Sequence, residues 1–94
     1  MTKLEKEAIY RRAIDEYGPE VQTLKACEEC GDLIRALSRA EITGELDNLI
    51  EEIADVEVVI EQQMLFRGIR RSDIDHVKEE KITRLYRRLS GNHS

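Results

Sequence analysis

Six acidic residues form two triplets with the same internal spacing, each inside a hydrophobic segment. The triplets are Glu28, Glu29 and Asp32 in the segment ACEECGDLIRAL, and Glu51, Glu52 and Asp55 in the segment LIEEIADVEVVI. A shift of 23 positions places the first triplet on the second, and flanking apolar positions coincide as well. The two segments therefore resemble a structural pseudo-repeat.

The spacing predicts that four of these carboxylates meet between two helices. At 100° per residue, the second glutamate and the aspartate of each triplet lie one turn apart beside the apolar stripe. These residues are Glu29 and Asp32 in the first triplet, and Glu52 and Asp55 in the second. If the helices pack antiparallel through their stripes, the four carboxylates converge, repel one another and lose hydration. A hard divalent cation such as Mg²⁺ or Mn²⁺ removes this conflict, because it prefers oxygen ligands.

Two features of the sequence bear on alternatives to a redox-inert metal site. A single motif of this kind in so acidic a chain would be read as ordinary charge on a solvated helix face, but two copies in register weaken that interpretation. A di-iron centre is disfavoured because the Glu-x-x-His motifs of di-iron bundles are missing. The pair Cys27 and Cys30 lacks further ligands at zinc spacing, so we expect two buried small residues there.

Turn and capping signals divide the chain into four helices. Thr2 to Glu5 fits a capping box that opens the first helix, and Gly18 followed by Pro19 suits the change to the second. The second helix is predicted to run to about Ala40, the third from about 46 to 66, and the fourth from about 73 to 89, with a tail over 90–94. No segment sustains strand alternation. Short connections then predict an all-α, antiparallel four-helix bundle.

Length and composition narrow the class of protein. A chain of 94 residues fits a single domain over 1–94, near the lower size limit for a self-sufficient core, so we expect oligomerisation to complete it. The net charge of -5 argues against a nucleic-acid partner. No run approaches a membrane span, and the first ten residues have no signal-peptide core, so a cytoplasmic location is expected.

At the two acidic motifs the sequence resembles the MazG-like all-α nucleotide pyrophosphohydrolases. That family pairs EExxE on one helix with EExxD on the next, and here the motifs read EECGD and EEIAD. The resemblance extends from about Tyr17 to Leu89. Asp32 stands where the family usually has Glu, and its shorter side chain would ligate through a shifted metal position or through a water.

The resemblance implies roles for the acidic residues. The implied ligands of Mg²⁺, or of Mn²⁺ in its place, are Glu29, Asp32, Glu52 and Asp55. Glu28 and Glu51 point about 100° away from these ligands, and two interpretations stay open for them. Either they act catalytically by orienting the attacking water, or they are simply solvated.

Basic residues are the candidates for binding a triphosphate. In the family a Lys and an Arg from the last helix commonly contact phosphate, which implies this role for Lys81 and Arg84. A solvated basic face near a helix C-terminus explains the same two residues equally well. Lys25 lies one turn before Glu29, where it either touches the ligand or offsets the carboxylates.

The resemblance implies Mg²⁺-dependent hydrolysis of a nucleoside or deoxynucleoside triphosphate to the monophosphate and pyrophosphate, as nucleotide-pool house-cleaning. It also implies a homodimer or homotetramer. One alternative is a phosphoribosyl-ATP pyrophosphohydrolase, although the Tyr-His that usually follows the second motif in that family is missing. The other is a non-catalytic helical module that oligomerises or binds a protein partner.

Overall fold

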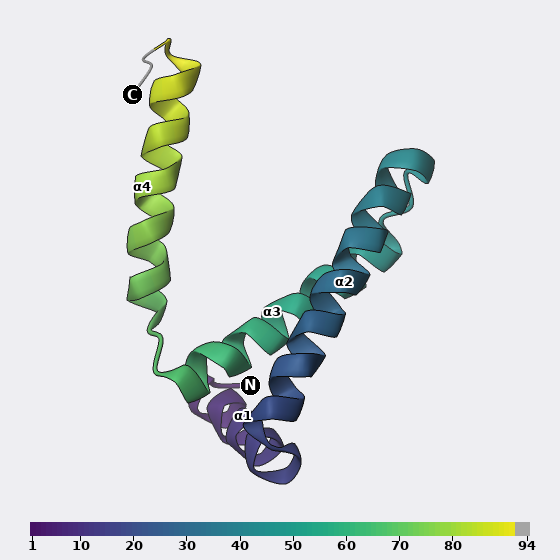
Figure 1. The fold of residues 1–94 in the computed structure, drawn as a ribbon, viewed down its shortest axis with the longest axis vertical. Coiled ribbons are helices and arrows are strands. Elements are labelled where there is room, and N and C mark those ends of the chain that lie inside the picture. The colour runs from purple at the N-terminus through teal and green to yellow at the C-terminus, as the bar shows by residue number, and fades with distance from the viewer. Residues whose placement is uncertain (92–94) are drawn as a thin grey trace.

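The computed structural model describes residues 1–91, and helices are the only regular secondary structure over that range (Figure 1). The four helices are α1 (Lys3–Tyr17), α2 (Pro19–Thr43), α3 (Asp47–Arg67) and α4 (Arg71–Leu89). The predicted helix class and number of helices are thus confirmed, whereas most of the tail predicted over 90–94 lies outside the described residues. Across the described residues no helix combines the length and the apolar character needed to cross a bilayer.

Most helix boundaries fall where the sequence signals predicted them. The Thr2 hydroxyl accepts from the Glu5 N–H and the Glu5 carboxylate accepts from the Thr2 N–H, both at 3.1 Å, which forms the expected capping box. Helices α2 and α3 end at Gly44 and Gly68, whose φ values of 74° and 70° are left-handed and favour glycine. These glycines therefore set the lengths of the two helices that carry the acidic triplets.

Two boundaries differ from the prediction. Helix α2 continues to Thr43 and not only to Ala40, because the left-handed cap comes at Gly44. Helix α4 begins at Arg71 and not at Asp73, because the Asp73 carboxylate accepts from the Arg70 N–H at 2.8 Å. Asp73 is thus the third residue of the helix, where an acidic side chain satisfies a free N–H and complements the helix dipole.

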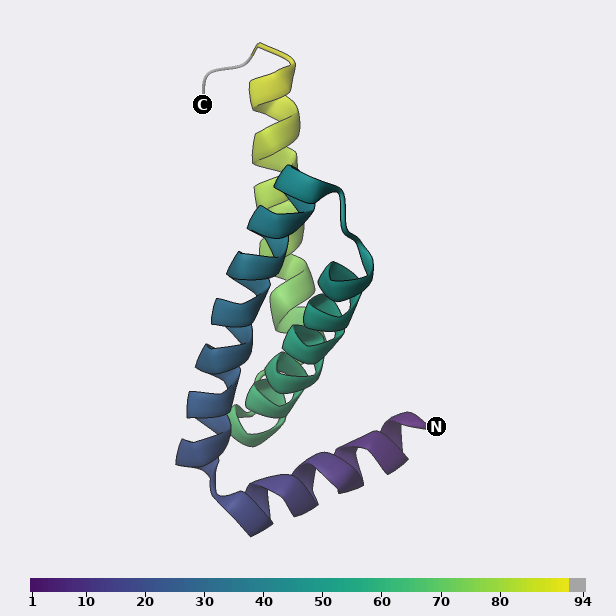
Figure 2. The same ribbon diagram turned by 90° about the vertical axis from the view of Figure 1, so that its right-hand side faces the viewer.

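Helices α2 and α3 form an antiparallel pair, joined by residues 44–46, and make the most extensive contact in the chain (Figure 2). The buried apolar residues at this contact are small, namely Ala26, Ala36 and Val59. Their size lets the two helices approach closely. Near the start of α2, the Gln63 amide donates to the Thr23 hydroxyl at 3.2 Å and ties the pair together.

Substituting Ala36 tests this close approach. Its side chain is only 2% exposed, so Ala36→Leu should overpack the contact and lower stability by about 1–3 kcal/mol. For a domain of this size that corresponds to a fall in Tm of roughly 4–8 °C per kcal/mol. Thermal unfolding followed by circular dichroism measures it. The matched control is Ala8→Leu at an exposed position on α1, and equal losses in both variants would contradict the close packing.

Helix α1 lies across the end of the α2–α3 pair (Figure 2) and is tied to α3 by a hydrogen bond from the Tyr10 hydroxyl to the Glu61 carboxylate. Burial raises the pKa of Tyr10 to about 12, with the Glu61 hydrogen bond and charge adding to the effect. The neutral phenol is the form that donates to Glu61. The bond is therefore kept through neutral pH and is lost as the pH rises through this value.

An ultraviolet titration of tyrosinate tests the contact. The wild type should show a step near pH 12 that is absent in Tyr10→Phe. In Glu61→Gln this step should move to lower pH without disappearing, because the partner charge is removed while the burial stays. A step near pH 12 that survives in Tyr10→Phe would show that another tyrosine carries it.

Helix α4 does not join a bundle within the chain. It packs against none of the other three helices and has no buried residue (Figure 1). The short connection after α3 predicted an antiparallel neighbour, but Gly68 and the extended backbone of Arg70 direct α4 away from the pair. The radius of gyration is consequently 16.6 Å, against about 12 Å for a compact domain of this length.

Candidate metal centre

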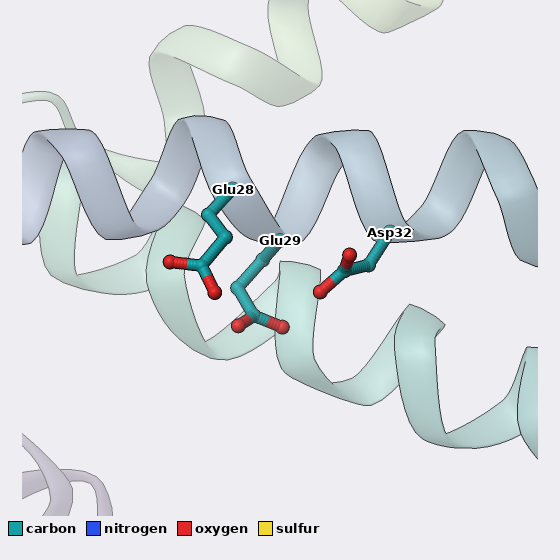
Figure 3. Close-up of side chains that lie close together, drawn as sticks. All are labelled: Glu28, Glu29 and Asp32. Atoms are coloured by element: carbon teal, nitrogen blue, oxygen red, sulfur yellow. The ribbon is translucent and has the colours of Figure 1, made fainter.

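Helices α2 and α3 bring the two acidic triplets together on one face of the pair. Glu29 is 7% exposed at the contact between the helices, although it is charged. Figure 3 shows that Glu28, Glu29 and Asp32 all leave α2 on the side that faces α3. A charged residue is rarely buried without a compensating partner, so Glu29 marks the centre of the site.

The carboxylates fall into two overlapping groups. In each group one oxygen of every residue lies within 4.8 Å of the others. The groups are Glu28, Glu29 and Asp32 from α2 alone, and Glu29, Glu52 and Asp55 from both helices. Three of the four carboxylates predicted to converge, Glu29, Glu52 and Asp55, therefore meet across α2 and α3 within a single chain, whereas Asp32 groups only with Glu28 and Glu29 on α2.

Glu52 carries the clearest electrostatic signature of this site. Burial raises the pKa of its carboxyl above the ordinary value of 4.5, and the charges of neighbouring carboxylates raise it further. Those neighbours are Asp32, Asp55, Glu29 and Glu51. Its Oε2 atom is also the one buried side-chain oxygen or nitrogen in residues 1–91 that has no hydrogen-bond partner. A buried acceptor of this kind calls for a cation or a donor.

Two basic side chains already compensate part of the negative charge. The Lys25 ammonium lies 3.1 Å from a Glu29 oxygen and 4.0 Å from Glu28, and the hydrogen bond to Glu29 raises the pKa of Lys25. Arg35 pairs with Asp32 one turn along α2. The sequence predicted the place of Lys25 but missed Arg35, although the three-residue spacing from Asp32 was available as a signal.

The other residues predicted for the site do not all lie with the carboxylates. Glu28 and Glu51 are both exposed, and Glu28 belongs to the first carboxylate group whereas Glu51 belongs to neither. Their catalytic role therefore stays a prediction. Lys81 and Arg84 lie on α4, and no part of α4 packs against α2 or α3. One chain therefore does not bring these two cations to the carboxylates.

Cys27 is exposed and Cys30 half-buried, so the expectation of two buried cysteines was wrong for Cys27.

No known protein family, no curated protein and no solved structure matches this chain. The chemistry of the site therefore has to be inferred from its own residues.

The residues at the site fit a small, hard cation. The two groups consist of carboxylates alone, on two helices whose packing fixes their positions. Oxygen ligands of this kind suit Mg²⁺ or Mn²⁺ better than softer metals. A cation at this point would supply the missing partner of Glu52 Oε2. It would also offset the burial and the neighbouring negative charges that raise the pKa of Glu52.

Proposed function

We propose that this protein hydrolyses a nucleoside or deoxynucleoside triphosphate between its α and β phosphates with the help of Mg²⁺. The observation that supports the proposal is the meeting of carboxylates from α2 and α3 around Glu29, where Glu52 keeps a buried oxygen without a partner. Water adds across the phosphoanhydride, so the products are a nucleoside monophosphate and pyrophosphate.

Under this proposal each part of the site has a task. Glu29, Asp32, Glu52 and Asp55 would hold Mg²⁺, which when bound neutralises phosphate oxygens and lowers the pKa of a water. Glu28 and Glu51, both exposed, would orient the attacking water and take its proton. The Lys25 ammonium exchanges its contact with Glu29 for a phosphate oxygen when the substrate arrives.

The proposal includes a homo-oligomer, a dimer or tetramer, with house-cleaning of the cytoplasmic nucleotide pool as its role. In one chain Lys81 and Arg84 are remote from the carboxylates, so another copy has to bring them to the triphosphate. A phosphoribosyl-ATP substrate would use the same carboxylates and the same bond cleavage. A non-catalytic helical module is the remaining alternative, and it predicts neither pyrophosphate release nor stabilisation by Mg²⁺.

The experiment is pyrophosphate release from a panel of ribo- and deoxyribonucleoside triphosphates and phosphoribosyl-ATP, with Mg²⁺ or with EDTA. Pyrophosphate release that needs Mg²⁺ supports the proposal. The ranking of substrates separates hydrolysis of a nucleoside triphosphate from hydrolysis of phosphoribosyl-ATP. If folded protein with Mg²⁺ releases nothing from any of these compounds, hydrolysis is excluded as the function and the helical module is favoured.

A further inference from the structure

A groove of about 560 Å³ lies between the N-terminal half of α1, the end of α3 and the start of α4. Figure 1 shows these three elements gathered at one end of the molecule. The volume is within the range of small-molecule sites. Met64, which lines the groove, lies about 180° round α3 from Asp55 and about 14 Å further along the helix axis. The groove is therefore separate from the candidate metal centre.

One part of the groove lining is apolar. It consists of Tyr10 on α1, Met64 and Leu65 at the end of α3, and Ile69 in the link before α4. Ile69 is 38% exposed and the other three residues are half-buried, so packing within the chain leaves all four partly open to solvent. A ligand with an aliphatic body would remove this surface from water, which is favourable.

The other part of the lining is charged, and positive charge dominates it. Four cationic side chains line the groove, together with only two carboxylates. The cations are Lys3, Lys6, Arg70 and Arg71, and the carboxylates are Glu7 and Glu61. The groove thus has a surplus of two positive charges, although the whole chain has a net charge of -5. This reversal of sign favours an anion at the groove.

These cations have donors to spare for a ligand. Within residues 1–91, neither Lys3 nor Lys6 forms an ion pair. Arg71 donates from its Nε to the Asp75 carboxylate at 3.1 Å. A guanidinium has further N–H donors, arranged in a fork that matches a carboxylate or a phosphate. The groove can therefore bind an anionic head group without first breaking the Arg71–Asp75 bond.

The lining also limits the kind of anion. Among the described residues, no Ser, Thr, Asn or Gln side chain lines the groove. Such side chains commonly hydrogen-bond the edge of a base or the hydroxyl of a sugar. The combination of aliphatic side chains with basic ones therefore suits an amphipathic anion better than a nucleotide.

We infer that this groove binds an alkyl chain that ends in an anionic head group, either a carboxylate or a phosphate. The alkyl chain covers Met64, Leu65 and Ile69, and the head group meets the lysine and arginine side chains. The inference adds a second site with a different ligand, and it does not depend on hydrolysis of a nucleotide.

Isothermal titration calorimetry of the full chain with decanoate, in EDTA, tests the inference. Decanoate should bind with a Kd of about 0.1 mM or tighter. Acetate keeps the head group without the chain, and decanol keeps the chain without the charge, so each should bind at least about 10-fold more weakly. Octanoate has a shorter chain and should bind roughly 5–15-fold more weakly than decanoate. Decyl phosphate in place of decanoate shows which head group the groove prefers.

A double variant on α1 tests the role of the lysines. Lys3→Gln with Lys6→Gln should weaken decanoate binding at least about 10-fold. Helix α1 should stay folded, because positive charge near a helix N-terminus is unfavourable and its removal does not destabilise the helix. The matched control is Arg11→Gln with Arg12→Gln, which removes the same charge from exposed positions of α1 outside the groove. It should leave the Kd within about twofold of the wild type.

Methionine methyl signals locate the ligand in the wild type. The chain has two methionines, of which Met64 lines the groove, whereas Met1 is 80% exposed and outside the lining. In protein labelled with ¹³C at its methionine methyl groups, decanoate should shift the nuclear magnetic resonance signal of Met64 and leave that of Met1 in place.

Three outcomes overturn the inference: acetate or decanol that binds as tightly as decanoate, equal losses of affinity in the two double variants, or saturation by decanoate without a shift of the Met64 signal. Pyrophosphate release is measured separately on the same samples. A protein that binds decanoate in the groove and hydrolyses nothing overturns the proposed function alone. A protein that hydrolyses nucleotides and does not bind decanoate overturns the groove alone.

Discussion

Replacing Glu52 with glutamine should lower Mg²⁺-dependent pyrophosphate release at least about 100-fold, because even residues that only support a metal ligand change activity or affinity 10–100-fold. Glu52 combines a raised pKa, a buried unpartnered oxygen and contact with carboxylates of both helices. The amide has nearly the same shape but lacks the negative charge that holds a cation. The measurement is kcat and KM at saturating Mg²⁺ on the best substrate of the panel.

The control is Glu57→Gln, which makes the same change at an exposed position of α3 outside the carboxylate groups. It should leave the rate within about twofold of the wild type. Glu28→Gln and Glu51→Gln then separate the two interpretations of these exposed residues. A lower kcat at unchanged KM indicates a role in proton transfer, and an unchanged kcat indicates that they are solvated. Full activity of Glu52→Gln would remove this carboxylate from the site.

The second large effect of Glu52→Gln is on thermal stability. Whether the variant melts above or below the wild type should depend on whether Mg²⁺ is bound. A cation that binds only the folded protein stabilises it by about 2.7 kcal/mol at a concentration 100 times its Kd. In a domain of this size that raises Tm by more than about 10 °C. With Mg²⁺, Glu52→Gln should therefore melt below the wild type, because the variant loses this gain.

With EDTA the order should reverse. The pKa of Glu52 is raised in the folded state, so the folded protein holds this proton more tightly than the unfolded chain does. The stabilisation that this proton gives the folded state is fully present below pH 4.5, the ordinary pKa of the group. It is lost as the pH rises through the raised pKa of the folded state. Above that pH the buried charge opposes folding in the wild type but not in Glu52→Gln. The variant should therefore melt above the wild type, by a margin that grows as the pH rises through the raised pKa of Glu52 and stays constant above it.

Differential scanning calorimetry of the wild type, Glu52→Gln and Glu57→Gln, with Mg²⁺ and with EDTA from pH 4.5 to pH 8, covers the whole comparison. Glu57→Gln should follow the wild type in every condition. If the wild type and Glu52→Gln keep the same order of Tm with and without Mg²⁺, the carboxylates do not hold a cation, and the metal site is wrong even if the fold is right.

The local features of the fold were predictable from the sequence. Helical periodicity predicted the helices, and the glycines at 44 and 68 predicted where α2 and α3 end. The matched spacing of the two triplets predicted that Glu29 and Glu52 would meet. The place of α4 was not predictable, because α4 packs against none of the other helices of the chain and no contact positions it. Side-chain pairing was predicted only in part. The helical spacing predicts that Lys25 lies beside Glu29, whereas the pairing of Arg35 with Asp32 was not predicted.

The link at Gly44 also bears on how the chain folds. Helices α2 and α3 are joined by residues 44–46 and form a helical hairpin whose contacts are local in sequence. Contacts of this kind form early and quickly, because little loop-closure entropy has to be overcome. The carboxylates around Glu29 all belong to this hairpin. We therefore expect Mg²⁺ to speed folding as well as slow unfolding, because the carboxylates proposed to hold it belong to the part of the chain that should form first.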